Sequence, residues 1–178
     1  MKILIYGFGR MGLTHYAILN SLIKNANFSF VEPNRKLNFL LRKNISANFY
    51  ESDIEINEQF DLTLITTPPF AHKQILEKRL EKGDTKIFVE KPFGGHNNCI
   101  TSFSGDQIFI GYVLRFNKII NWVKTNIDPK NVAEVNASYL SNTIVKKPDG
   151  WRNGKFSGVL NEMGSHIIDL SNYLFDLS

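Results

Sequence analysis

The sequence has only one cysteine and no long apolar run. Cys99 is the single cysteine among 178 residues, which excludes an intramolecular disulfide and every cysteine-rich zinc motif. It favours a reducing compartment, so we expect a cytoplasmic protein. No stretch approaches the roughly 20 consecutive apolar residues of a membrane span, and the apolar run at residues 1–6 is too short for a secretion signal. The sequence therefore predicts no membrane partner.

The chain also has little excess of either positive or negative charge. The 21 Lys and Arg against 17 Asp and Glu leave a formal net charge of +4. Because the charged residues are interspersed rather than gathered into a stripe, we do not expect a nucleic-acid partner. Apolar material is plentiful, since 43% of the residues are hydrophobic and 14 are Phe. The chain is long and apolar enough to form one globular domain and part of a second.

Strand and helix patterns alternate in the first half of the chain. Short apolar runs predict strands, and apolar residues at helical spacing predict helices between them. The predicted strands cover residues 2–6, 28–32, 47–50, 61–66 and 86–89, and the predicted helices cover 11–24, 35–43 and 69–82. This alternation indicates an α/β fold with helices flanking a parallel sheet.

The second half of the chain has a different pattern. It predicts a loop at 93–106, a strand at 107–113, a helix at 116–125, a long alternating strand at 132–145, an exposed loop at 146–157 and a helix at 159–175. Because the alternation of strand and helix ends near Leu114, we place the domain boundary there. The prediction is a first domain at 1–114 and a partial substrate or oligomerisation domain at 115–178.

A glycine motif lies between the first predicted strand and the first predicted helix. Residues 7–12 read Gly-Phe-Gly-Arg-Met-Gly, and this context is the one in which G-x-G-x-x-G indicates a dinucleotide site. Gly7 permits a tight turn, Gly9 lets the backbone approach a pyrophosphate, and Gly12 lets the helix pack on the sheet. The helix amides then hold the anion, so the first domain is predicted to bind a dinucleotide.

Glu32 ends the second predicted strand, about 20 residues after the motif, where a carboxylate accepts hydrogen bonds from the adenosine ribose. It would repel the 2′-phosphate of NADP. Arg35 and Lys36 lie within reach of the same ribose and would attract that phosphate. We predict NAD as the cofactor, with NADP as the alternative.

Five further motifs follow along the chain. They are Thr66-Thr67-Pro68-Pro69-Phe70-Ala71-His72, Glu90-Lys91-Pro92, Gly111-Tyr112-Val113-Leu114-Arg115-Phe116, Trp151-Arg152 and Gly158-Val159-Leu160-Asn161-Glu162-Met163-Gly164-Ser165-His166-Ile167-Ile168-Asp169. Their order and register resemble the Gfo/Idh/MocA oxidoreductases over essentially the whole chain. The resemblance implies an NAD(P)-dependent oxidoreductase acting on a sugar, cyclitol or nucleotide sugar. The predicted fold is a Rossmann-type doubly wound parallel sheet followed by a partial α/β second domain.

Lys91 is the first predicted catalytic residue. It follows a buried strand at the edge where open parallel sheets bind ligands, and Pro92 keeps it extended. Its ammonium can donate to a substrate hydroxyl and favour the developing alkoxide or carbonyl oxygen, which makes it a substrate-binding residue too. An ordinary solvated lysine is the alternative.

A second set of predicted catalytic residues lies near the C-terminus. Glu162, His166 and Asp169 stand at i, i+4 and i+7, so they share one helix face. His166 would take the hydroxyl proton, with Glu162 or Asp169 orienting it. A histidine satisfied within a domain interface is the alternative. One nitrogen and two carboxylates make a poor metal site, so no metal is predicted.

The remaining site predictions come from the motif positions. Cofactor contacts are predicted for Arg10, Met11, Thr67, Pro68, His72, Glu90, Trp151 and Arg152, and substrate contacts for Tyr112, Arg115 and Asp169. A plain helix N-terminus explains Thr67 to His72 nearly as well. His15 and His96 are interpreted as structural or solvated.

Several features depart from the family pattern. Pro69 replaces an asparagine, the segment between Pro92 and Gly111 is short, and Glu162 replaces an aspartate. The sequence also stops at Ser178, whereas typical members continue with further strands. Either the chain is a fragment or another chain supplies the missing layer, so we predict a homo-oligomer through the C-terminal portion. The short C-terminus also favours an alternative function, a non-catalytic dinucleotide-binding or scaffold protein derived from the family.

Overall fold

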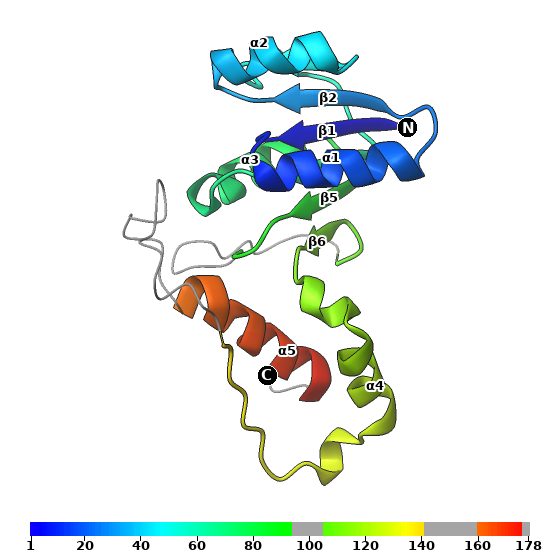
Figure 1. Ribbon diagram of the computed structural model, residues 1–178, viewed down its shortest axis with the longest axis vertical. Coiled ribbons are helices and arrows are strands. Elements are labelled where there is room, and N and C mark those ends of the chain that lie inside the picture. The colour runs from blue at the N-terminus through cyan, green and yellow to red at the C-terminus, as the bar shows by residue number, and fades with distance from the viewer. Residues whose placement is uncertain (94–104, 141–159, 176–178) are drawn as a thin grey trace. The chain divides into compact units, whose positions relative to one another are not determined.

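The computed structural model of this chain describes residues 1–93, 105–140 and 160–175. The chain divides into two compact units, a first unit at Met1–Gly111 and a second unit at Tyr112–Ser178 (Figure 1). Each unit has its own arrangement of elements.

Six parallel strands form the sheet of the first unit, in the order β3-β2-β1-β4-β5-β6. Their bounds are β1 Lys2–Tyr6, β2 Asn27–Val31, β3 Asn48–Tyr50, β4 Leu62–Ile65, β5 Lys86–Val89 and β6 Ile108–Ile110. The order reverses between β1 and β4, which places the ligand crevice beyond the carboxyl ends of these strands. The predicted Rossmann-type parallel sheet is confirmed, and the strand expected at 107–113 joins it as the shorter β6.

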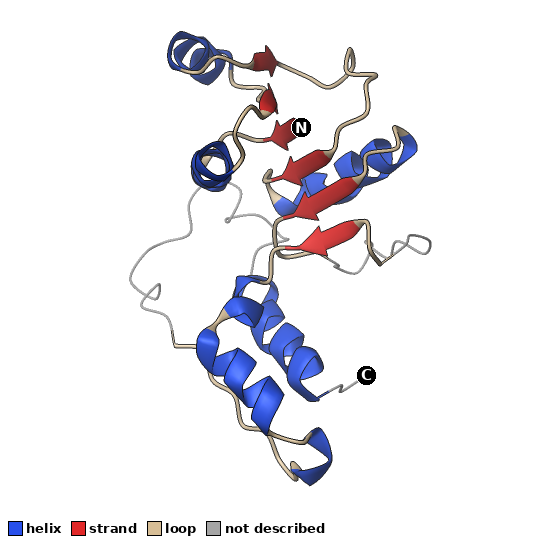
Figure 2. Ribbon diagram, turned by 90° about the vertical axis from the view of Figure 1, so that its right-hand side faces the viewer, coloured by secondary structure: helices blue, strands red, loops and turns tan. Residues whose placement is uncertain are grey.

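Three helices flank this sheet. They are α1 Arg10–Leu22, α2 Arg35–Asn44 and α3 His72–Glu81, the last preceded by a 3-10 turn, η1 Pro69–Ala71. Asn34 caps α2, because its side-chain oxygen accepts hydrogen bonds from the N–H groups of Lys36 and Leu37. Figure 2 shows α3 on the opposite face of the sheet from the other two helices, as expected for a doubly wound fold.

Alternate residues of β1 pack into the two halves of the core. Ile3 and Ile5 lie in an aromatic-rich cluster with Phe30, against partly buried residues of α1 and α2. Leu4 and Tyr6 lie in a second cluster, which a side chain of α3 covers. This alternation is the two-residue period of a strand that is buried on both faces.

A fully buried ion pair fastens α3 to the sheet. Arg79 on α3 and Asp84 before β5 are 0% exposed, and their Nη2 and Oδ1 atoms are 2.6 Å apart. Arg79 Nε also donates to Asp84 Oδ2 at 2.8 Å. Asp84 accepts further hydrogen bonds from the Phe60 amide and the Thr63 hydroxyl. These bonds satisfy the carboxylate that burial removes from water.

Helices and helical turns are the only regular elements in the described part of the second unit. It contains the 3-10 turn η2 Val113–Phe116, α4 Lys118–Asn126, the 3-10 turn η3 Pro129–Asn131, a π turn η6 Leu160–Gly164 and α5 Ser165–Phe175. The predicted strand at 132–145 is wrong over residues 132–140, which have no regular structure. Strand-like alternation needs a neighbouring strand to become a strand, and no strand pairs with this segment in the described residues. Residues 141–145 lie outside the described ranges.

The helix predicted at 159–175 begins differently from the expectation. Its described first turn, Leu160–Gly164, has π geometry, and the regular α-helix starts at Ser165. A π turn is wider than an α turn, so it changes the angular position of the residues that precede it. His166 and Asp169 therefore share one face of α5, while Glu162 lies in the wider turn.

Candidate functional site

The glycine motif forms a tight turn at the carboxyl end of β1. Gly7 has a φ of +80°, a left-handed conformation that side chains rarely adopt, and its N–H donates to the Val31 carbonyl at 2.9 Å. The Thr66 hydroxyl oxygen lies 2.8 and 2.7 Å from the carbonyl oxygens of Tyr6 and Gly7, which share its one proton. The turn is therefore fixed by neighbours from both adjacent strands.

The other two glycines of the motif differ in their surroundings. A Cβ on Gly12 would lie 2.1 Å from the Gly7 carbonyl oxygen, so this position must be glycine for α1 to pack on the turn. A Cβ on Gly9 would meet no atom within 4 Å. The surface at Gly9 is thus open to a ligand, and it lies directly before the first helical amides, which have no carbonyl partner within the helix.

Glu32 lies beside this turn, immediately after β2. Its Oε2 accepts a hydrogen bond from the Phe8 amide at 2.8 Å, and its Oε1 accepts one from the Asn34 amide at 2.9 Å. These two bonds orient the carboxylate while leaving lone pairs for further donors such as ribose hydroxyls. The structure thus brings Glu32 and the glycine turn together, as the spacing suggested.

His72 is buried rather than open to a ligand. It is 1% exposed, and its Nε2 lies 2.8 Å from the Thr67 carbonyl oxygen. Because a carbonyl can only accept, Nε2 carries the proton. Burial lowers the pKa of His72 and outweighs the opposing effect of the backbone acceptors, so the ring is neutral near pH 7. His72 supports the loop after β4, next to Thr67 and Pro68.

Glu90 has a partner that the sequence analysis did not foresee. His15 Nε2 on α1 lies 2.8 Å from Glu90 Oε1, and the His15 ring packs edge-on against Phe88 with centroids 5.0 Å apart. Glu90 is 8% exposed and directly precedes Lys91, which is half-buried. The pair joins the glycine-motif helix to the loop after β5. The available signal was that His15 follows Gly12 by three residues, which places both on one helix face.

The second unit gathers four of the predicted site residues. Arg115 Nε donates to Asp169 Oδ2 at 2.9 Å, and Arg115 Nη2 donates to Oδ1. His166 is buried, with its ring 6.1 Å from Tyr112 edge-on and 6.0 Å from Tyr139 in a stacked arrangement. Burial raises the pKa of Tyr112, so its phenol is neutral. Asp169 is therefore paired with Arg115.

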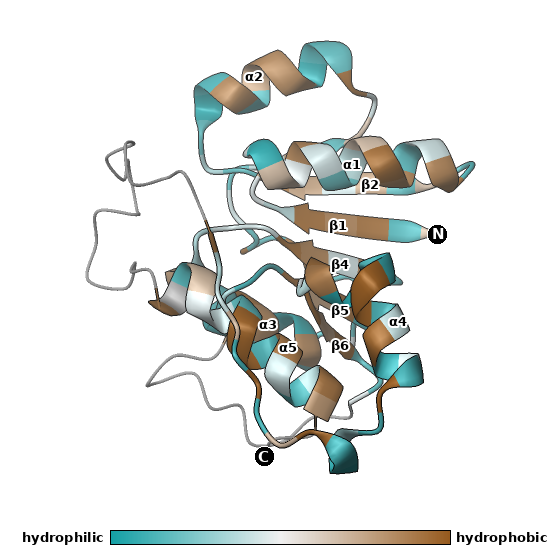
Figure 3. Cartoon of the chain, turned by 60° about the horizontal axis from the view of Figure 1, so that its bottom comes forward, coloured by the Kyte–Doolittle hydropathy of each residue, from teal (hydrophilic) through white to brown (hydrophobic). Residues whose placement is uncertain are grey.

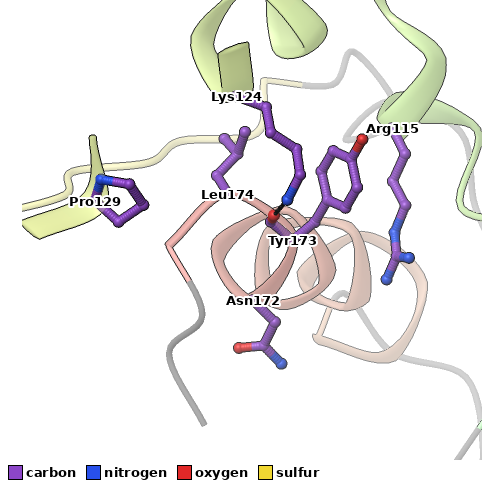
Figure 4. A pocket seen from close by; sticks show the side chains of 6 residues that line it. All are labelled: Arg115, Lys124, Pro129, Asn172, Tyr173 and Leu174. Atoms are coloured by element: carbon purple, nitrogen blue, oxygen red, sulfur yellow. Dashed lines mark hydrogen bonds between the residues drawn. The ribbon is translucent and has the colours of Figure 1, made fainter. Parts of the chain in front are cut away.

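A pocket of about 520 Å³ also lies within the second unit (Figure 4). It is lined by Arg115, Lys124, Pro129, Asn172, Tyr173 and Leu174. Lys124 Nζ donates to the Tyr173 carbonyl and lies 4.0 Å from the centre of that ring, while the Arg115 guanidinium lies 5.0 Å from it. Each cation already has a partner, the carboxylate of Asp169 for Arg115 and the Tyr173 carbonyl for Lys124. The contacts explain how α4 and η2 pack on α5.

The remaining observations concern two predicted cofactor residues, metal sites and membrane spans. Trp151 and Arg152 lie outside the described residues. Among the residues that are described, no group of three His, Cys, Asp or Glu side chains is placed to hold a metal ion. No helix in the same ranges is long and apolar enough to cross a membrane.

Residues 1–98 match the model of the Gfo/Idh/MocA oxidoreductase family, which has an NAD-binding Rossmann fold. The chain belongs to this family. Glucose-6-phosphate 3-dehydrogenase of Bacillus subtilis strain 168 is 25% identical over 190 residues, which cover 98% of this chain and 54% of the relative. The uncharacterized protein UNK4.17 of Schizosaccharomyces pombe is 30% identical over 141 residues, which cover 68% of this chain and 34% of that protein.

Solved structures of similar fold include an oxidoreductase with its ligands. The WlbA dehydrogenase of Chromobacterium violaceum, in complex with NADH and UDP-GlcNAcA, has a TM-score of 0.73 and 18% identity, and the match covers 98% of this chain and 55% of that one. A myo-inositol dehydrogenase of Corynebacterium glutamicum has a TM-score of 0.66 at 16% identity, over 98% and 54% of the two chains. At these identities the likeness shows the fold. The chain spans 54% of the length of the Bacillus subtilis relative and 34% of the length of the Schizosaccharomyces pombe relative.

The first unit fits the dinucleotide of this NAD-binding family. The open surface at Gly9 and the amides of Arg10, Met11 and Gly12 suit a pyrophosphate, since no acidic residue lies in the first turn of α1. The oriented carboxylate of Glu32 suits a ribose. The cofactor predicted from the glycine motif together with Glu32, NAD, is the one that the family binds.

Proposed function

We propose that this chain is an NAD(P)-dependent oxidoreductase that transfers a hydride between nicotinamide and a hydroxyl or carbonyl of a sugar, cyclitol or nucleotide sugar. One observation carries the cofactor half of this proposal. The open glycine turn and the oriented Glu32 lie side by side, joined by the hydrogen bond from the Phe8 amide. The names of the relatives, which include a sugar-phosphate dehydrogenase, support the substrate class.

The proposed chemistry divides between binding and proton transfer. When bound, the nicotinamide supplies the hydride acceptor or donor. Lys91, in the loop after β5, donates a hydrogen bond to the substrate oxygen and stabilises the charge that develops there. His166 accepts the hydroxyl proton, and the edge-on ring of Tyr112 and the stacked ring of Tyr139 limit the directions that its imidazole can adopt. Arg115, whose charge Asp169 neutralises, is the polar residue of this cluster of side chains in the second unit.

Self-association is a further part of the proposal. The second unit exposes many large apolar side chains, among them Phe116, Ile119, Trp122 and Leu140. Large exposed apolar surfaces mark sites of protein association. We therefore propose a homo-oligomer through the C-terminal portion, residues 115–178. The single cysteine is the basis on which we also propose a cytoplasmic location. Sedimentation at tens of micromolar would test the first, and a monodisperse monomer would contradict it.

Cofactor binding and turnover test the proposal separately. Calorimetric titration of the whole chain with NAD measures the first, and nicotinamide absorbance with a panel of sugars, cyclitols and sugar nucleotides measures the second. Removing a positioned acid or base costs about 10² to 10⁴ in rate, so Lys91→Ala and His166→Ala should lose turnover by that factor. Both variants should keep the NAD affinity, because neither residue belongs to the pyrophosphate site. A loss below tenfold in both would exclude their proposed roles.

A second candidate function is a dinucleotide-binding or scaffold protein without catalysis. The observation that favours it is that the glycine turn and the oriented Glu32, which suffice for dinucleotide binding, both lie in the first unit. The same experiment separates the two functions. NAD binding without turnover of any panel compound would support the scaffold.

A further inference from the structure

Two carboxylates and one guanidinium meet at the edge of the sheet where the adenosine ribose is proposed to bind. Val31 and Tyr50 are paired in register at the ends of β2 and β3, so Glu32 and Glu51 emerge side by side. The Glu32 amide donates to the Tyr50 carbonyl at 2.9 Å, which holds the two segments together beyond the strands. Two negative side chains therefore leave the same edge of the sheet on adjacent strands.

The two carboxylates have different partners. Glu32 is oriented by the amides of Phe8 and Asn34. Glu51 Oε2 accepts a hydrogen bond from Arg35 Nε at 2.9 Å. Arg35 is the first residue of α2, and an arginine near this position is what accommodates a 2′-phosphate in dinucleotide sites of this type. The cation that would recognise NADP is thus held by a neighbouring acid.

We propose that Glu51 is a cofactor-specificity residue, which holds Arg35 away from a 2′-phosphate and adds a second negative charge beside Glu32, so that the chain prefers NAD to NADP. This inference rests on the proposed dinucleotide site and adds to it a residue outside the glycine motif. A ribose 2′-hydroxyl is neutral and is not repelled. A 2′-phosphate carries between one and two negative charges near pH 7 and meets two carboxylates.

The preference for NAD that Glu51 confers is expected to be modest and to depend on salt. The Arg35 and Glu51 side chains are 83% and 51% exposed, and exposed pairs are weak and screened by salt. Lys36, the next residue, has no carboxylate partner in the described part of the chain, so one cation stays available to a phosphate. Glu51 therefore shifts the ratio of the two affinities by a modest factor, largest at low ionic strength.

Isosteric neutral variants test the role of Glu51. Glu51→Gln in the whole chain should raise the NADP affinity about three- to tenfold at low salt, and the gain should shrink at high salt, because exposed charges are screened beyond about one Debye length. The NAD affinity should change less than twofold. In the double variant Glu51→Gln with Arg35→Gln the gain should disappear. Calorimetric titration of each variant with NAD and with NADP, at 50 mM and at 500 mM salt, measures the four affinities.

Glu58→Gln is the matched control. Glu58 pairs with Lys2 at 2.6 Å, is similarly exposed, and lies at the opposite end of the strands, so this variant makes the same change in net charge away from the ribose. An equal gain in NADP affinity from Glu58→Gln would overturn the inference in favour of net charge. An unchanged ratio of NADP to NAD affinity in Glu51→Gln, with NAD still bound, would overturn the inference alone. If the parent chain binds neither dinucleotide, the proposed function fails and the inference fails with it.

Discussion

The two units of this chain differ in what holds their elements together. Every described hydrophobic side chain that is fully buried lies in the first unit, in three clusters around the sheet. The buried residues described in the second unit are His166 and Asp169, both polar. Figure 3 shows apolar residues along the strands and also on α4. In the first unit they are covered, whereas Ile119 and Trp122 on α4 are 71% and 61% exposed. Apolar burial is therefore the main source of stability in the first unit alone.

The ion pairs of the two units follow the same contrast. Arg79 and Asp84 are fully enclosed, and each has further hydrogen bonds. Arg115 is 42% exposed, and it reaches buried Asp169 from the surface. A buried pair is costly to break because a charge is left without water, whereas a hydrated arginine can lose its partner at little cost.

Separating the units should give the largest effect. Residues 1–111 expressed alone should unfold in urea as one cooperative transition, because all three apolar clusters lie within them. Residues 112–178 alone should show no cooperative transition, since their described part lacks a buried apolar cluster. Circular dichroism during urea titration of both pieces measures this. A cooperative transition of 112–178 at low concentration would remove the contrast.

Neutralising the aspartate of each ion pair compares the units in the whole chain. Asp84→Asn should lower the free energy of unfolding by about 3 to 5 kcal/mol, because Arg79 would keep a buried charge without its counter-ion. Asp169→Asn should cost about 1 kcal/mol or less, because Arg115 stays partly hydrated. Urea denaturation of both variants measures the two losses. Equal losses would mean that the burial of the cation does not decide the cost.

The glycine motif offers a matched pair within the first unit. Gly12→Ala should destabilise the chain by about 3 kcal/mol, because the new Cβ would meet a backbone oxygen at 2.1 Å and the turn is held on both sides. Gly9→Ala should leave the stability nearly unchanged, since its Cβ enters open space, but it should weaken NAD binding, because that space is the proposed path of the pyrophosphate. Denaturation and calorimetric titration of both variants test this. A normal NAD affinity in Gly9→Ala would place the pyrophosphate elsewhere.

The two units also differ in how far their elements could be predicted from the sequence. The strands and the glycine turn of the first unit were predictable because their signals are local: an apolar run, then glycines at fixed spacing, then a helix. The strand at 132–140 was wrong for a related reason. Its residues alternate as a strand requires, but a strand also needs a neighbouring strand with which to pair. No single stretch of sequence reveals whether that partner exists.

Contacts between distant residues account for most of what was missed at the site. His15 and Glu90 are 75 positions apart, and Arg115 and Asp169 are 54 apart. Their pairing depends on how helices lie on the sheet or on one another, which residue spacing within one element does not contain. Glu32 could be placed beside the glycine turn because the crossover from β1 to β2 is short and its geometry recurs.

The smallest predicted effect is a pH dependence in the first unit. Burial lowers the pKa of His72 below its ordinary value of 6.5, so the native ring stays neutral while the unfolded chain takes up a proton below that pH. The unfolded state then binds more protons, and the stability that His72 contributes is present above pH 6.5 and is lost as the pH falls toward the native pKa. One proton changes the free energy of unfolding by at most about 1.4 kcal/mol per pH unit. His72→Gln keeps a donor for the Thr67 carbonyl but does not titrate. The free energy of unfolding of this variant should therefore fall less steeply than that of the parent chain between pH 6.5 and pH 5.5. These pH values are chosen from the pKa of the unfolded histidine. Urea denaturation at both pH values gives the two slopes, and parallel slopes would mean that His72 is as easily protonated in the folded protein as in the unfolded chain.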